Sequence, residues 1–126
     1  MIFYFLLTKA TPRNTMYIKR RGIVWTRGLL DVCVLAAIKT EDSYGYQIIK
    51  DMRPYMEISE STLYTILKRL ETANMLTVRT AEHGGRLRKY YHITSEGQKR
   101  LEEFKNEWRE VMKIYQFVTE EDAIHE

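Results

Sequence analysis

The segment at residues 59–71 combines polar side chains that can bind a nucleic acid with a helical spacing of its apolar ones. Leu63, Ile66, Leu67 and Leu70 recur at intervals of three and four, which predicts a helix with one buried face. The positions outside that face carry hydroxyls and cations: Ser61, Thr62, Tyr64, Thr65, Lys68 and Arg69. Hydroxyls can bond to base edges or phosphates, and cations bind phosphates. This helix is therefore predicted to contact a polyanion.

A second group of cations follows on a segment with the composition of a β-hairpin. Apolar and polar residues alternate over residues 76–80 and strand-like composition resumes over 89–94. Between them, Gly84-Gly85 can adopt the positive φ angles that tight hairpin connections require. The hairpin residues expected to contact nucleic acid are Arg79, Arg86, Arg88, Lys89 and Tyr90. For any single arginine, the alternative is a solvent-exposed charge on an edge hairpin with no ligand. This alternative explains less well why the cations occur together with the hydroxyl-bearing helix.

The residue patterns of common catalytic and metal sites are missing from the sequence. The single cysteine, Cys33, lies in an apolar run, so neither a disulfide framework nor a cysteine metal site can be built. His83, His92 and His125 lack the spacing of metal ligands, and no glycine-rich phosphate loop precedes a helix. We therefore expect a protein that is not an enzyme, with no metal and no cofactor, in a reducing compartment.

Length and composition predict one compact domain with appendages. The chain has 126 residues, of which 44% are hydrophobic and 29% charged, as in a globular protein. Its longest uninterrupted apolar stretch, residues 2–7, falls far short of the roughly 20 residues that span a bilayer, so we expect no membrane contact. Residues 101–126 are acidic and the rest of the chain is basic. This asymmetry suggests a polyanion-facing surface that is separate from the C-terminal segment.

Three helices are expected before the hairpin, at about residues 23–39, 44–52 and 60–73. Apolar residues between Gly28 and Ile38 cover most of a helical surface, so the first helix should be largely buried. The polar residues 40–43 can cap the second helix, and Ser59 or Ser61 can cap the third.

The segment after the hairpin predicts a long helix with one apolar seam. Thr94 or Ser95 can cap this helix, and Glu96 in its first turn interacts favourably with the helix dipole. Its apolar residues form two series with a period of seven, and the seam is Leu101, Phe104, Trp108, Val111, Tyr115 and Val118. Because the rest of the helix is charged, the seam must be buried against another surface. A partner chain is the economical cover, and packing on the first helix of the same chain is the alternative, which does not exclude dimerisation.

Three helices, a hairpin and a long helix predict a mainly α fold with a small β-hairpin. This order is that of a winged helix-turn-helix, here followed by a long C-terminal dimerisation helix. The expected divisions are a disordered extension or leader at residues 1–22, a winged-helix domain at 23–94, a dimerisation helix at 95–120 and an acidic tail at 121–126. A winged helix used only for protein contacts is the alternative function, but it does not call for exposed Lys68 and Arg69 or for a charged wing.

Three blocks of the sequence resemble the PadR family of transcriptional regulators. They are Tyr44-Gly45-Tyr46-Gln47-Ile48, residues 61–71 and residues 84–91, and they occur in the family's order with similar gaps. Leu87 departs from the wing of the family, where a second arginine or a lysine is more common. The resemblance, which covers roughly residues 25–118, implies a cytoplasmic, homodimeric repressor that binds inverted repeats of double-stranded DNA.

The single helix after the wing resembles the small branch of that family. Members of this branch dimerise through their last helix, and some sense flat aromatic or cationic molecules held between aromatic side chains at the dimer centre. Trp108 is the residue here that suits such an effector. Plain interface packing of Trp108 is the alternative, because large aromatic side chains dominate interfaces.

Overall fold

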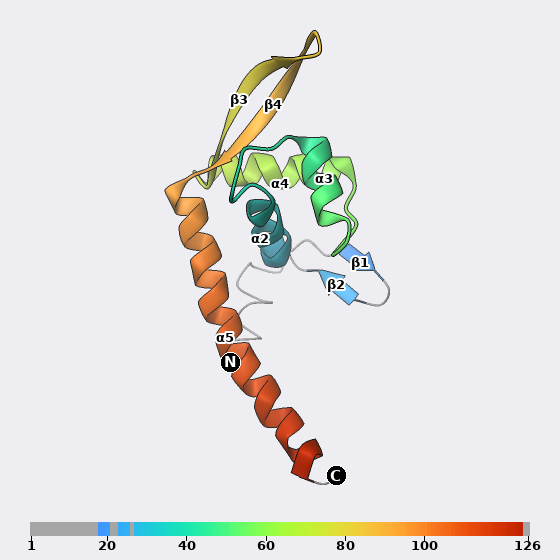
Figure 1. Cartoon of the computed structure of the whole chain (residues 1–126), viewed down its shortest axis with the longest axis vertical. Helices are drawn as coiled ribbons and strands as arrows, with labels where there is room; N and C mark the ends of the chain where they lie inside the picture. Colours follow the sequence, from blue (N-terminus) through green and yellow to red (C-terminus); the bar gives the residue numbers. More distant parts are fainter. Residues whose placement is uncertain (1–17, 21–22, 26, 125–126) are drawn as a thin grey trace.

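A computed structural model describes residues 18–20, 23–25 and 27–124 of the chain (Figure 1). Its elements are β1 (Ile18–Arg20), β2 (Ile23–Trp25), α2 (Arg27–Ala37), α3 (Gly45–Met52), α4 (Glu60–Thr72), β3 (Leu76–His83), β4 (Arg86–Ile93) and α5 (Ser95–Ile124). The helices α2, α3 and α4 form a cluster, from which the β3–β4 hairpin projects in one direction and α5 in the other. The architecture is a mainly helical winged helix-turn-helix with a long C-terminal helix, as the sequence predicts.

The apolar core lies where α2, α3 and α4 meet under the base of the hairpin. Leu63, Ile66, Leu67 and Leu70, the predicted inward face of α4, are all at most 2% exposed. They pack in one cluster with buried residues of α2 and α3 and with Leu76, Tyr91 and Ile93 from the hairpin. Each fully buried aliphatic side chain contributes about 1.5–3 kcal/mol relative to exposure, so this cluster sets how α4 and the wing are oriented.

The first helix begins later than the sequence predicts. Ile23–Trp25 forms strand β2, which pairs antiparallel with β1, and α2 begins only at Arg27 and ends at Ala37. The expectation of a helix from Ile23 is therefore wrong. Ile, Val and Trp suit a strand as well as a buried helix, and a short apolar run does not distinguish the two. Apart from residues 18–20, the extension predicted for residues 1–22 lies outside the described residues.

The helix caps agree with the predictions at α4 and α5. Ser59 precedes α4, and its hydroxyl accepts a hydrogen bond of 3.1 Å from the backbone amide of Thr62. Thr94 precedes α5, and its hydroxyl accepts a 3.1 Å bond from the amide of Gly97. Both bonds satisfy amides that have no partner within their helix. They fix the start of each helix relative to the chain before it.

The turn before α3 has a different role from the expected one. Its residues do not cap α3, because the N-cap is Tyr44, whose side chain makes no capping bond. Instead, Ser43 pairs with Tyr91 of β4 through two backbone hydrogen bonds of 3.2 and 2.7 Å. The α2–α3 turn thereby adds a one-residue antiparallel bridge to the hairpin and ties the wing to the helical cluster.

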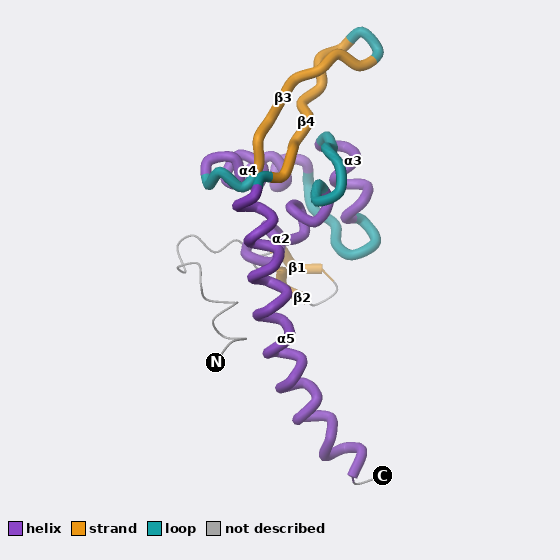
Figure 2. The backbone as a smooth tube through the Cα atoms, turned by 60° about the vertical axis from the view of Figure 1, so that its left-hand side comes forward, coloured by secondary structure: helices purple, strands orange, loops and turns teal. Residues whose placement is uncertain are grey.

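The β3–β4 hairpin is paired along its full length. Leu76 lies opposite Ile93 at the base, and His83 lies opposite Arg86 at the tip. Gly84 and Gly85 have φ angles of 58° and 80°, the positive values that the sequence analysis expected at this turn. Figure 2 shows the hairpin standing out from the helices, so most of its length is accessible to a ligand.

Among the described elements, α5 packs chiefly against α2 and β4. Leu101 is half-buried against the core, and the helix then runs clear of the other described elements (Figure 2). It continues to Ile124, so residues 121–124 of the predicted acidic tail are helical. Within the described part of the chain, no helix is both long enough and apolar enough to cross a membrane.

Candidate nucleic-acid interface

The side of α4 that faces away from the core carries the predicted polar residues. Ser61, Tyr64, Thr65 and Lys68 are exposed, and Thr62 is half-buried. The side chain of Lys68 has no ion-pair partner among the described residues, so its charge is available to a ligand. This side of α4 has hydroxyl groups near its start and a cation beyond them.

The hydroxyls of α4 are already oriented by bonds within the helix. Ser59 and Ser61 join their hydroxyls at 3.1 Å, and the Ser59 hydroxyl donates to that of Thr62 at 2.9 Å. The hydroxyl of Thr65 donates to the carbonyl of Ser61 at 2.8 Å, which leaves its lone pairs as acceptors. Thr65 is therefore set to accept a hydrogen bond, for example from a base amino group.

Arg69 differs from the other predicted residues of α4. Its guanidinium forms an ion pair with Asp31 of α2, and the two side chains are only 19% and 22% exposed. Arg69 therefore fastens α4 to α2 and is not the free cation that the sequence analysis expected. The spacing within α4 could not reveal this, because the partner lies on an earlier helix.

Arg79 is likewise engaged within the protein. Its Nε lies 3.2 Å from a carboxylate oxygen of Asp42, and its guanidinium lies 4.7 Å from the ring centroid of Tyr90. The other carboxylate oxygen of Asp42 is 2.7 Å from Nδ1 of His92. The hydrogen bond with His92, followed by that with Arg79, lowers the pKa of Asp42. Arg79 therefore links the wing to the α2–α3 turn.

A cation–π contact and an edge-to-face ring contact continue this link to the start of α3. The guanidinium of Arg88 lies 3.9 Å from the ring centroid of Tyr44, and Tyr44 meets Tyr90 edge to face at 5.8 Å. Tyr90 is thus half-buried between Tyr44 and Arg79, and the structure gives it a packing contact where the sequence predicted a ligand contact. Cation–π contacts of this kind contribute roughly 0.5–1 kcal/mol at exposed sites. Here they also hold Arg88 in one orientation.

A groove of about 520 Å³ separates the wing from α3 and α4; it is lined by Tyr44, Gly45, Tyr46, Tyr64, Leu87, Arg88, Lys89 and Tyr91. None of these lining residues is acidic. The phenol of Tyr64 lies close against Gly45, because a Cβ there would be 2.6 Å from its hydroxyl oxygen. Two cations opposite exposed phenols suit a phosphodiester backbone, which accepts hydrogen bonds and carries negative charge.

Apart from Arg69, Arg79 and Tyr90, which are engaged within the protein, the predicted binding residues lie in three places. Tyr64, Arg88 and Lys89 line the groove, whereas the other exposed residues of α4 do not. Arg86 is exposed at the wing tip, where it lies opposite His83. The groove also contains three residues that the sequence did not predict as part of the site, although the first block of the family resemblance was an available signal: Tyr44, Gly45 and Tyr46.

The predicted seam of α5 divides into a part that packs on the described core and a part that is largely exposed. Leu101 packs on the core, and the rings of Phe104 and Trp108 stack with centroids 6.0 Å apart. Farther along, Tyr115 and Val118 are 59% and 60% exposed. Three further apolar side chains that the sequence analysis did not single out are also exposed: Met112, Ile114 and Phe117.

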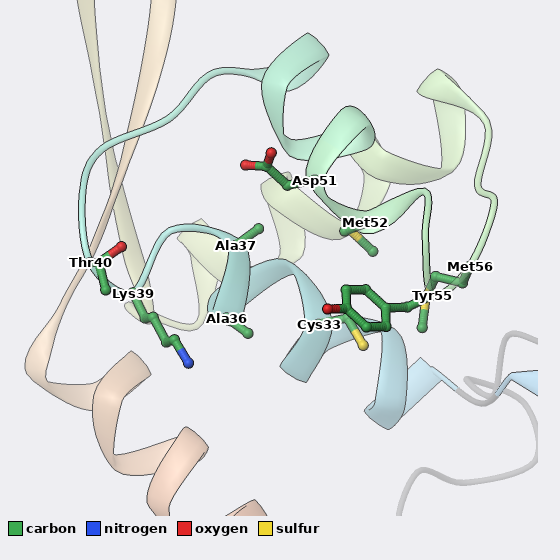
Figure 3. A pocket seen from close by; sticks show the side chains of 9 residues that line it. All are labelled: Cys33, Ala36, Ala37, Lys39, Thr40, Asp51, Met52, Tyr55 and Met56. Atoms are coloured by element: carbon green, nitrogen blue, oxygen red, sulfur yellow. The ribbon is translucent and has the colours of Figure 1, made fainter.

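The described residues contain no group of three His, Cys, Asp or Glu side chains that could hold a metal ion. A hollow of about 450 Å³ lies between α2 and the end of α3, and its lining includes Cys33, Asp51 and Tyr55 (Figure 3). Burial raises the pKa of the Cys33 thiol, which makes it a poor nucleophile. The lining has no histidine beside the thiol to act as a base.

Comparison with known proteins agrees with this geometry. Residues 34–103 match the transcriptional regulator PadR-like family. A PadR family transcription regulator from Clostridium difficile is 36% identical, with a TM-score of 0.65 over 71% of this chain and 97% of that one. A Streptococcus mutans protein is 44% identical, with a TM-score of 0.66 over 73% and 88% of the two chains. Bacillus subtilis PadR, solved in complex with operator DNA, shares the fold at 23% identity and a TM-score of 0.57, over 60% of this chain and 46% of that one.

The family match begins in α2 and extends through α3, α4 and the wing into the first turns of α5. It therefore includes the whole groove and the tie between the wing and the α2–α3 turn. The chain belongs to the PadR-like family of transcriptional regulators, and it is a regulator rather than an enzyme.

Proposed function

We propose that the protein is a cytoplasmic repressor that binds a specific operator in double-stranded DNA. The observation that carries this proposal is the groove between the wing and the helices, in which Arg88 and Lys89 face the phenols of Tyr46 and Tyr64 with no acidic lining residue. The operator complex of Bacillus subtilis PadR, a protein of the same fold, supports the assignment.

In this proposal, α4 lies in the major groove and the hairpin lies against the neighbouring backbone. Ser61, Thr62 and Thr65 then read base edges, while Lys68 binds a phosphate beside them. Arg86, Arg88 and Lys89 bind phosphates from the wing. Arg69 and Arg79 act indirectly, because their ion pairs hold α4 and the wing in the orientation that such contacts need.

We further propose that a homodimer binds an inverted repeat. The exposed apolar side chains of α5 beyond Val111, such as Phe117 at 69% exposure, are the surface that a second copy would cover. A two-fold axis relating two copies gives an isologous interface. It would place the two α4 helices about 34–36 Å apart, one turn of DNA.

The effector proposal rests on Trp108, which is 39% exposed. A shallow hollow of about 420 Å³ lies beside it, lined by Phe104, Lys105, Trp108, Arg109, Met112, Lys113 and Gln116. The three cations of this lining favour a flat aromatic molecule over a cationic one, since like charges repel. The effector would stack on Trp108 and change how the two copies are arranged.

The experiment that tests the proposed function is selection of duplexes from a random DNA library by the full-length protein. We expect an inverted repeat to be enriched. The logarithm of its binding constant should fall linearly with the logarithm of the salt concentration, with a slope of about −0.9 for each neutralised phosphate. Failure to enrich any sequence would refute specific DNA binding and favour a winged helix that contacts only proteins.

A further inference from the structure

The tip of the wing carries a large apolar side chain that no described element covers. Leu87 is 79% exposed, more than any other large apolar residue of the described chain. It stands directly between Arg86 and Arg88, on a hairpin whose other exposed side chains are largely polar. Leu87 does not pack into the core. Its side chain is therefore either covered by a ligand or left in contact with water.

Leu87 is also held in a defined position. It lies opposite Glu82 in a hairpin that is paired up to the last residues before the turn. The next residue, Arg88, is fixed on the ring of Tyr44 at 3.9 Å, which ties this end of β4 to the start of α3. The position of Leu87 relative to α3 and α4 is therefore set by the fold.

The turn beyond Leu87 is a two-residue connection that protrudes from the protein. Gly84 and Gly85 form it, and a Cβ at either glycine would have no neighbour within 4 Å. Leu87 itself lines the groove that also contains Tyr64 and Lys89. A DNA backbone lying along this groove would lead from the major groove at α4 to the adjacent minor groove at the wing tip.

We propose that Leu87 enters the minor groove and wedges between two base pairs, which unstacks and kinks the duplex at that step. This inference rests on the proposed DNA binding. It adds that the protein selects DNA sequences by how easily one base-pair step unstacks. Lys89, which leaves β4 on the same face as Leu87, would hold a phosphate beside the step while the apolar side chain meets the bases. Pyrimidine–purine steps unstack at the least cost, so the wing would select TA or CA steps that it does not read by hydrogen bonds.

The test uses duplexes selected from a random library by the full-length protein, with 2-aminopurine placed at each step of the flank next to the α4 site. Unstacking of 2-aminopurine raises its fluorescence. Binding of the unaltered protein should raise the signal at one step, Leu87→Ala should abolish the rise, and Leu87→Met should retain it. The preference for TA over GC at that step should fall roughly 5-fold or more in Leu87→Ala, the size of a single mismatched base pair.

The outcomes separate this inference from the function on which it rests. If the protein enriches no duplex, both are wrong. If it binds a selected duplex without any rise in fluorescence, or if Leu87→Ala gives the same rise, then DNA binding stands and the wedge is refuted. Circular dichroism checks that the hairpin of Leu87→Ala remains folded.

Discussion

At the root of the wing, the carboxylate of Asp42 holds two basic side chains at once, Arg79 and His92. Both belong to the hairpin, whereas Asp42 belongs to the α2–α3 turn. Arg69 has a similar role between α4 and α2, where it pairs with Asp31. Basic residues near the interface thus fall into two kinds, those that orient the elements and those that remain available to a phosphate.

The tie at Asp42 predicts a pH dependence of stability. The pKa of Asp42 is lowered below its ordinary value of 3.8, first by His92 and then by Arg79, so the folded state favours the charged carboxylate. The stability that such a carboxyl contributes is fully present at a pH above its ordinary pKa. It is lost as the pH falls through the lowered pKa of the folded state. The melting temperature of Asp42→Asn should therefore lie below that of the unaltered protein at pH 7. The gap should close below pH 3.8.

Glu82→Gln is the matched control for Asp42→Asn, because Glu82 is an exposed carboxylate of the wing without a partner among the described residues. Its melting temperature should follow that of the unaltered protein at every pH. A gap between Asp42→Asn and the unaltered protein that stays constant down to pH 2 would contradict the role assigned to the carboxylate.

Lys68 and Arg69 are neighbours in sequence that should respond differently to substitution. Lys68→Ala should reduce the slope of log binding constant against log salt by about 0.9, the value of one phosphate, with little change in stability. Arg69→Ala should lower the free energy of unfolding by about 1–3 kcal/mol, because it removes a half-buried ion pair, and should leave the slope unchanged. Salt titrations of operator binding and urea denaturation measure the two effects. Equal slopes for Lys68→Ala and the unaltered protein would refute a phosphate contact.

Individual site residues were predictable where one helix or strand decides their position. The spacing of three and four in α4 correctly separates buried Leu63 and Leu67 from exposed Tyr64 and Lys68. The same spacing cannot show that Arg69 meets Asp31, since that contact depends on how α2 crosses α4. The groove escaped prediction for this reason too, because it is made by three elements that only the tertiary fold brings together.

At the scale of elements, the junction of α4, the hairpin and α5 depends on one glycine. A Cβ on Gly97 would lie 2.3 Å from the carbonyl oxygen of Met75 and 2.7 Å from a side-chain carbon of Ile93. The first of these neighbours is backbone and cannot rotate away. The absence of a side chain at Gly97 therefore lets α5 start against the end of α4 and against β4.

Gly97→Ala should consequently destabilise the protein. Alanine is about 1 kcal/mol more favourable than glycine inside a helix, but overpacking costs about 1–3 kcal/mol, and contact with backbone places this site at the upper end. We expect a net loss in urea denaturation, whereas Gln98→Ala, at an exposed neighbouring position, should be neutral or slightly stabilising. An unchanged or raised stability of Gly97→Ala would show that α5 can shift away from Met75.

The spacing of apolar residues predicts the order and type of most elements. Where each element begins and ends depends on the turn and capping residues beside it. α3 and α4 lie close to their predicted bounds, because a turn or capping residue stands beside each. The two hairpin strands extend three residues farther toward the turn than the sequence predicts, since His83 and Arg86, at the predicted break, pair with each other. No turn or capping residue was recognised between Ile23–Trp25 and α2, so the sequence predicts this strand as part of the helix. The extension of α5 to Ile124 could not be foreseen either, since charge alone does not end a helix.

At the scale of the whole molecule, the β3–β4 hairpin and the distal part of α5 project from opposite sides of the helical cluster (Figure 1). The hairpin lines the basic groove, and the distal part of α5 carries the exposed apolar side chains. The proposed DNA binding and the proposed dimerisation would therefore use separate surfaces. The sequence identified the seam, but not the turn at which it leaves its own core, because that depends on how α5 packs against α2. Leu101 belongs to the monomer, whereas Tyr115 and Val118 are free for a partner.

This division predicts that substitutions near the end of α5 separate the dimer without unfolding the monomer. Tyr115→Glu combined with Val118→Glu places two charges on side chains that are 59% and 60% exposed, so the fold should be retained. Sedimentation at micromolar concentration should then give a monomer of about 15.1 kDa, against a dimer for the unaltered chain. Operator affinity should fall because the two half-sites are no longer coupled. Lys113→Glu, which changes the net charge by the same amount on the polar side of α5, should stay dimeric. If the double variant remained dimeric with full operator affinity, the distal part of α5 would not be the interface.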